Sequence, residues 1–291
     1  MSALPITRLS VKEAVSRRLL LAGVLLSLAF LALFALGFNA LYSRVASEAG
    51  QAEAAMAGQA ETAVAGAIMT MLGVYIVQFL VAFLALFLAT GAVSSEIDSG
   101  TLHAILARPL SRRSWLGQRW LAFAGTIAAY AVLMAGLLLG IAQMIAGYGA
   151  VAPWRAIGLL VLEGLVLLSL GFLGSTLWST LANGAVVFSL FGMAWLAGII
   201  EFAGEMVGND LMRNIGIAVS LLVPSDALWR GAAYYLQSPA FMAASSAVGE
   251  PGGAGPFGGS APPSAALIGW SIAYVVLLLA MAARRFGRRD L

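Results

Sequence analysis

The sequence predicts an all-α membrane protein with six transmembrane helices. Of its 291 residues, 61% are hydrophobic and only 10% are charged, whereas a soluble globular domain carries about 25% charged residues. The mean hydropathy of +0.95 and a series of long apolar runs indicate the same class. Residues 19–291 are therefore expected to form a single transmembrane domain, with no room for a separate soluble catalytic domain.

The composition also excludes several kinds of chemistry. The chain has no cysteine, which excludes disulfides, Cys-ligated zinc, iron–sulfur clusters and thiol catalysis. Its net charge of +3 comes from basic residues that flank apolar runs instead of forming a stripe, so a nucleic-acid partner has little support. We predict no metal and no cofactor on this chain, and a lipid membrane as its environment.

Residues 1–18 are predicted to form an interfacial helix on the cytoplasmic surface. Four basic residues, a single acid and interspersed apolar residues are typical of such helices. A basic flank that only orients the first span is the alternative. The first span, residues 19–41, would reach about 34 Å as a helix, which is enough to cross a bilayer and long for a signal peptide.

Apolar runs place the spans at about 19–41, 64–93, 115–145, 154–180, 184–202 and 265–283. The Ala-, Gln- and Glu-rich residues 42–63 favour a helical extension outside the membrane. Leu181–Gly184 is expected to be a hinge of small residues between spans 4 and 5. Gly136 and Gly140 form a GxxxG pattern in span 3, which allows helices to approach closely.

Residues 203–263 form the longest predicted segment between spans. Leu211–Val223 is apolar but has only 13 residues, too few to cross as a helix. Pro224 followed by Ser225 indicates a helix start with Ser225 as N-cap, and Trp229 is expected at the membrane interface. The Gly-, Pro- and Ser-rich residues 247–263 indicate a flexible loop.

The positions of Lys and Arg predict the orientation. With six spans, the side that holds both termini carries twelve of the sixteen basic residues, in segments 1–18, 94–119 and 284–289. Because cytoplasmic loops are enriched in Lys and Arg, both termini are predicted to be cytoplasmic and residues 203–263 extracytoplasmic.

The polar segment Ser94–Arg119, between spans 2 and 3, is predicted to contain a short cytoplasmic helix. Hydroxyls and acids suit its start, Gly100 permits a tight bend, and the residue before Pro109 resists helical geometry. From these residues alone, a capped loop with arginines reaching the headgroups is the alternative.

Two motifs in this segment resemble a known family. Glu96-Ile-Asp-Ser-Gly-Thr-Leu102 and Leu106-Ala-Arg-Pro-Leu-Ser-Arg112 are similar to the signature that follows the second span in permease subunits of type-2 ABC exporters. The six-span subgroup that includes the permease of the nitrous-oxide-reductase copper-maturation transporter is the most similar. The resemblance is strong over the first half of the chain and rests in the second half on the span layout and on residues 222–229.

The resemblance implies that residues 94–109 form a coupling helix that docks on a separate ATP-binding subunit. Two permease copies, identical or related, would pair with two ABC ATPase subunits in a prokaryotic cytoplasmic (inner) membrane. ATP and Mg would bind to the ATPase, because this chain has no GxxxxGK[ST] motif. The residues expected to contribute to coupling are Glu96, Gly100, Thr101, Leu102, Ile105, Leu106, Arg108, Pro109 and Arg112.

Polar residues inside predicted spans are a second set of candidates. Glu163 has no partner nearby in the sequence, and intramembrane acids are candidates for a transport pathway. The alternatives are a shallow position that reaches outside water and a role in capping a neighbouring helix. Gln78, Gln143 and Asn183 are expected to form interhelical hydrogen bonds. The apolar side chains of span 5 either line an apolar path or face lipid: Phe188, Phe191, Met193 and Trp195.

The sequence therefore favours a transport subunit that is not itself an enzyme. An intramembrane enzyme would need clustered acids, histidines or Ser–Lys pairs, and the chain has a single histidine, His103, and a single lysine, Lys12. An ion-coupled carrier acting without an ATPase is the other alternative, although no internal repeat supports it.

Overall fold

A computed structural model describes residues 18–49, 55–93, 112–247, 255 and 258–287, and every regular element in these ranges is a helix. Six of the helices are long and apolar enough to cross a membrane, so the predicted all-α class with six membrane-spanning helices is confirmed. Their bounds are α2 Arg18–Ala49, α3 Ala55–Thr90, α6 Arg112–Ala146, α7 Pro153–Ser175, α8 Thr180–Val207 and α12 Ala265–Gly287. The predicted interfacial helix 1–18 lies outside the described residues except for Arg18, which begins α2.

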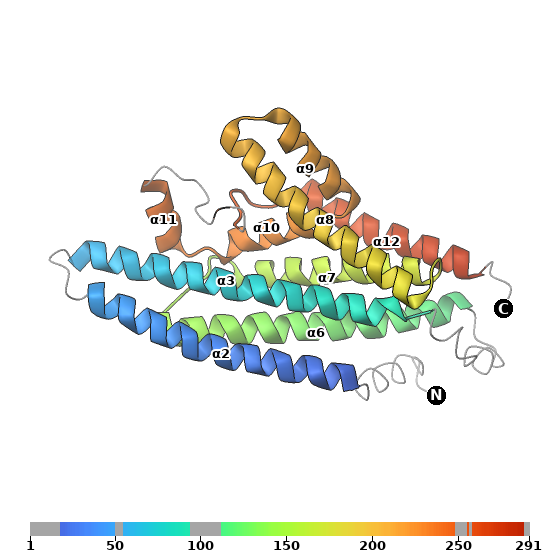
Figure 1. The fold of residues 1–291 in the computed structure, drawn as a ribbon, viewed down its shortest axis with the longest axis horizontal. Coiled ribbons are helices and arrows are strands. Elements are labelled where there is room, and N and C mark those ends of the chain that lie inside the picture. Colours follow the sequence, from blue (N-terminus) through green and yellow to red (C-terminus); the bar gives the residue numbers. More distant parts are fainter. Residues whose placement is uncertain (1–17, 50–54, 94–111, 248–254, 256–257, 288–291) are drawn as a thin grey trace.

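The long helices form a bundle in which α3 and α7 are central (Figure 1). Helix α3 packs against α2, α6 and α7, and α7 packs in addition against α12. Helix α2 begins and α12 ends at the same end of the bundle, which we call the terminal end; the opposite end is the distal end (Figure 1). The arrangement agrees with an even number of crossings.

The second and third long helices extend beyond the predicted spans. Helix α2 continues to Ala49 and α3 begins at Ala55, so most of the Ala-rich segment 42–63 is helical. With 36 residues, α3 is about 54 Å long, whereas the hydrocarbon core of a bilayer is about 30 Å thick. Helix α3 must therefore tilt in the membrane or project from it.

The break between α7 and α8 lies earlier than the sequence indicates. Residues 176–179 form the turn, and the predicted hinge Leu181–Gly184 is the first part of α8. The side chain of Asn183 donates hydrogen bonds to the carbonyls of Thr90 (3.2 Å) and Gly171 (2.9 Å). This confirms the predicted interhelical role of Asn183, and it joins the base of α8 to α3 and α7.

Segment 203–263 contains three further helices, α9 Asp210–Leu222, α10 Ser225–Leu236 and α11 Pro239–Ala247. Gly208 turns the chain in the left-handed conformation (φ 67°), and the Asn209 side chain caps α9 by accepting from two backbone N–H groups. Helix α9 runs back along α8, and α10 leaves it at an angle of 102° (Figure 1). The two helices are too short to span separately, and together they form a bent pair.

Two predictions about α10 were wrong. Its N-cap is Pro224 without a side-chain cap, and Ser225 is its first, buried residue. Trp229 is 1% exposed and packs against the Tyr75 ring with centroids 5.1 Å apart. The side chain is thus part of the core because α10 packs along α7 instead of lying on the surface.

The end of α10 is fixed to the turn between α6 and α7. The backbone N–H groups of Val151 and Ala152 donate to the carbonyls of Gln237 and Tyr235, both at 3.0 Å. The Tyr148 hydroxyl donates to the Leu236 carbonyl. Burial raises the pKa of Tyr148, so the hydroxyl keeps its proton and remains a donor.

The GxxxG residues of α6 do not mediate packing within the described part of the chain. A Cβ added at Gly136 or Gly140 would meet no described atom within 4 Å. The closest helix approaches use other glycines, such as Gly171 of α7, which lies against Ala89 of α3.

Candidate functional site: an intramembrane polar cluster and an aromatic groove

Nearly all of the residues predicted to couple to an ATPase lie outside the described part of the chain. Glu96, Gly100, Thr101, Leu102, Ile105, Leu106, Arg108 and Pro109 lie outside the described residues. Arg112 is the first residue of α6, and its side chain is not described. The coupling role of this segment stays a prediction.

Glu163 lies near the middle of α7 and is 1% exposed. The side-chain amide of Gln78, on α3, donates a hydrogen bond of 2.9 Å to Glu163 Oε1. The hydrogen bond confirms the predicted interhelical role of Gln78, and the burial of Glu163 shows that its side chain is not exposed at the surface of this structure. Among the described atoms, Glu163 Oε2 and Gln78 Oε1 have no hydrogen-bond partner.

A second group of charged side chains joins α8 to α10. Arg230 Nη2 donates to Glu201 Oε2 at 2.7 Å, and Arg230 Nε lies 3.1 Å from Asp226 Oδ2. Asp226 and Glu201 are 7% and 9% exposed. A buried charge is costly unless it is paired, and the two carboxylates share the single guanidinium of Arg230 as their partner.

Two glycines make room for these carboxylates. A Cβ at Gly198 of α8 would overlap the Asp226 carboxylate, and a Cβ at Gly216 of α9 would overlap Glu201. Gly198 and Gly216 therefore allow α8, α9 and α10 to meet around three charged side chains.

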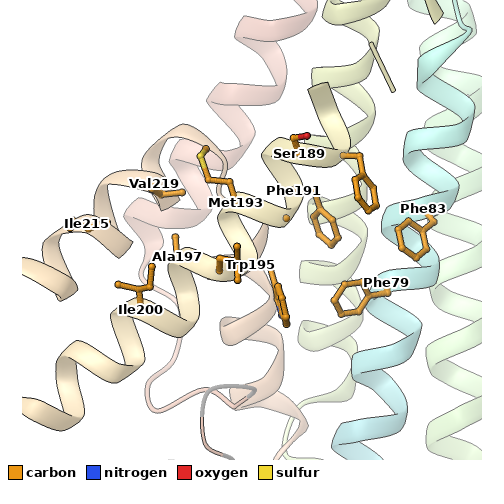
Figure 2. A pocket seen from close by; sticks show the side chains of 13 residues that line it. Phe79, Phe83, Ser189, Phe191, Met193, Trp195, Ala197, Ile200, Ile215 and Val219 are labelled. Carbon is orange, nitrogen blue, oxygen red and sulfur yellow. The ribbon is translucent and has the colours of Figure 1, made fainter. Parts of the chain in front are cut away.

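On another side of α8, an apolar groove of about 740 Å³ lies between α3, α8 and α9 (Figure 2). Rings from α3 and α8 that line it are in contact with each other: Phe83 and Phe188 stack with centroids 6.1 Å apart, and Phe79 meets Phe191 edge to face at 5.6 Å. Ile215 and Val219 of α9 close the far side. All four residues that the sequence offered for an apolar path or a lipid face line this groove: Phe188, Phe191, Met193 and Trp195.

Tyr75 connects the groove with the polar cluster. Its hydroxyl accepts a hydrogen bond from the Trp195 indole N–H, and its ring packs on Trp229, the neighbour of Arg230 in α10. The groove, Trp195, Tyr75 and the charged cluster are therefore in continuous contact through α3, α8 and α10.

Sequence reasoning missed the charged cluster. The predicted layout puts Asp226 and Arg230 in the extracytoplasmic segment 203–263 and Glu201 at the end of the fifth span. The (i, i+4) spacing of Asp226 and Arg230 predicts a pair on one helix face, but nothing in the sequence relates that pair to Glu201. Gln143, the third predicted hydrogen-bonding residue, is exposed on α6.

The described residues contain no group of three or more His, Cys, Asp or Glu side chains that could hold a metal ion. The arrangement is instead that of an apolar, aromatic-lined groove beside a cluster of two carboxylates and one guanidinium.

Comparison with known protein families identifies the family of this chain. Residues 6–291 match the family described as ABC-2 family transporter protein. No curated protein sequence matches the chain. Because the match extends over nearly the whole chain and six helices have the length and composition of membrane spans, this protein belongs to the ABC-2 family of transporter membrane proteins.

Proposed function

We propose that this chain is the permease subunit of an ABC exporter and moves its substrate with ATP hydrolysed by a separate ATPase subunit. The observation that carries the proposal is the family match over residues 6–291. The motif residues Glu96 to Arg112 lie between the second and third long helices, the position of the coupling segment in the related permeases. Two permease copies would pair with two ATPase subunits, which bind ATP and Mg.

The terminal end of the bundle would face the cytoplasm. In the described residues it carries Arg113 at the start of α6 and Arg284 and Arg285 at the end of α12, as the enrichment of basic residues on the cytoplasmic side requires. ATP-driven motion of residues 94–112 would reach both α3 and α6, because the segment joins those helices. Helix α3 contributes Phe79 and Phe83 to the groove, so this motion would change the groove directly.

Within the family we place the chain in the six-span subgroup that resembles the permease of the nitrous-oxide-reductase copper-maturation transporter. The six long helices and the residues of the two motifs support this placement. The assembly as a homodimer in a prokaryotic inner membrane belongs to the same proposal.

The experiment is co-expression of the full chain with candidate ABC ATPase subunits from the same organism, followed by co-purification and measurement of ATP hydrolysis in proteoliposomes. We expect a stable complex. The variants Glu96→Ala and Gly100→Trp should lower permease-dependent hydrolysis by about tenfold or more, which corresponds to about 1.4 kcal/mol in the activation free energy of the coupled reaction.

Gly117→Trp is the matched control. Gly117 lies on α6, near the same end of the bundle, and a Cβ there meets no described atom within 4 Å. The control should retain hydrolysis. A chain that purifies alone, ignores the ATPase and is active without it would contradict the proposal and favour a carrier or an intramembrane enzyme.

A further inference from the structure

The groove between α3, α8 and α9 differs from an ordinary lipid-facing surface in composition. Five of its 13 lining residues are aromatic, whereas aromatic residues make up 10% of the chain. The exposed face of α2, by contrast, is aliphatic, with Leu25, Leu33 and Leu36 between 67% and 71% exposed. Aromatic rings concentrate where a flat or chain-like apolar molecule is held, because they give large contact areas with few rotatable bonds.

Its shape also differs from that of a flat helix face. The rings of Phe79 and Phe83 come from one helix and those of Phe188 and Phe191 from another, with α9 as a third wall (Figure 2). A volume of about 740 Å³ falls within the range of about 300–1,000 Å³ that small-molecule sites occupy.

The polar atoms near the groove indicate the charge of its occupant. No charged residue lines it, and Ser189 is the single polar lining residue apart from the Trp195 indole. The Trp195 N–H is already donated to Tyr75. Glu201, Asp226 and Arg230 are joined to one another in the cluster between α8 and α10, and none of them lines the groove. An ion in the groove would lose its hydration without finding a partner, which is costly.

From these observations we infer that the groove binds the uncharged apolar body of the transported molecule, and that the substrate is a neutral hydrophobic or amphipathic compound taken from the bilayer. This inference rests on the proposed transport function. The inference adds the class of substrate to the proposed transport function. Binding of the substrate to the groove can be measured without the ATPase.

Gly192 offers a way to fill the groove without disturbing its walls. It lines the groove, and a Cβ there meets no described atom within 4 Å. Gly192→Leu places an aliphatic side chain in the empty space, and the change also favours the helix. Gly125→Leu is the matched control, because Gly125 is equally open but lies on α6 outside the groove.

The experiment uses the full chain alone in lipid nanodiscs with an uncharged photoprobe, 3-(trifluoromethyl)-3-phenyldiazirine, and maps the labelled peptides by mass spectrometry. We expect saturable labelling of the segment Phe188–Trp195 and unsaturable labelling of the α2 face. Gly192→Leu should raise the probe concentration for half-saturation by about tenfold, whereas Gly125→Leu should leave it unchanged. A trimethylammonium derivative of the same probe should give no saturable label in the groove.

Three results would overturn the inference. The first is groove labelling that does not saturate or that survives Gly192→Leu. The second is groove labelling that falls, when lipid is added at a constant amount of probe, to the same extent as labelling of the α2 face, because the occupant would then be bilayer lipid. The third is efficient cross-linking of two copies through Ser189→Cys together with loss of the probe label, which would make the groove a subunit interface. Since the ATPase is absent, none of these depends on the test of the transport complex.

Discussion

At the scale of single residues, Glu163 is the least expected feature. An acid in the middle of an apolar helix is expensive in a membrane, and the chain compensates for it with one amide from a helix 85 residues away in sequence. The hydrogen bond joins α3 and α7, the two central helices. Glu163 is therefore an interhelical contact in the described state, while its place in a transport pathway stays a prediction.

Replacing Glu163 by Ala should destabilise the protein by about 1–2 kcal/mol, because the Gln78 amide is then buried without its acceptor. Glu163→Gln keeps an acceptor at the same place and should cost less than half as much. Unfolding in mixed detergent micelles, followed by circular dichroism, measures both. A Glu163→Ala variant as stable as the parent would mean that the hydrogen bond contributes nothing to the fold.

The Glu163→Gln variant also distinguishes a structural role of Glu163 from a role in transport. In the complex with the ATPase, a Glu163→Gln variant that is stable but fails to transport would assign the carboxyl group to the pathway. A variant with full transport would leave Glu163 with the packing role alone.

At the scale of helices, small residues decide which pairs approach closely. Gly171 and Ala89 bring α7 and α3 together, and Gly198 and Gly216 admit the carboxylates that join α8, α9 and α10. Gly136 and Gly140 of α6 have the GxxxG spacing, but no described atom lies within 4 Å of a Cβ added at either residue. Spacing alone therefore did not identify the close contacts, because any glycine facing the right neighbour serves the purpose.

Two glycines of α7 provide a matched test. A Cβ at Gly171 would overlap Ala89, whereas a Cβ at Gly158 meets no described atom within 4 Å. Gly171→Ala should destabilise the bundle by about 1–3 kcal/mol through overpacking, and Gly158→Ala should be neutral or stabilise it by up to about 1 kcal/mol through helix propensity. Thermal unfolding of the two variants in one detergent checks the difference. Equal stability would contradict the tight α3–α7 contact.

At the scale of the whole molecule, the α8–α9 hairpin lies to one side of the bundle formed by the other long helices (Figure 1). It is attached at its base through Asn183 and further along through Trp195 and Glu201. The groove lies where this hairpin and α3 face each other. Movement of α3 relative to α8 would therefore reshape the groove, a hinge-type transition of the kind that transporters use.

The orientation of the whole chain can be tested with single cysteines, because the sequence has none of its own. Ser47, at the end of α2, and Arg285, at the end of α12, are both exposed and lie at opposite ends of the bundle. A membrane-impermeant maleimide should label Ser47→Cys in cells with an intact inner membrane and Arg285→Cys only after permeabilisation. The reverse pattern would overturn the positive-inside assignment.

Composition and the length of the apolar runs predicted the class of this protein, because both depend on whether the chain is surrounded by water or by lipid. A chain with 61% hydrophobic and 10% charged residues has too little polar surface for water, and the bilayer thickness fixes the length of its helices. The sequence placed the turn between α7 and α8 too late, at residues 181–184. Leu181, Asn183 and Gly184 are compatible with a helix, and the structure includes them in α8. The hydrogen bonds of Asn183 to α3 and α7, which the sequence could not supply, fix the start of α8.

By itself, the sequence determined an all-α membrane protein, its six long helices, the asymmetry of its basic residues and its likeness to a permease family. Tertiary structure alone decided that Gln78 meets Glu163, that Arg230 meets Glu201, and that the rings of two distant helices form one groove. The physical reason is that hydropathy depends on each residue and its near neighbours. The partners of a buried polar group, and the walls of a groove, depend instead on which helix faces pack together.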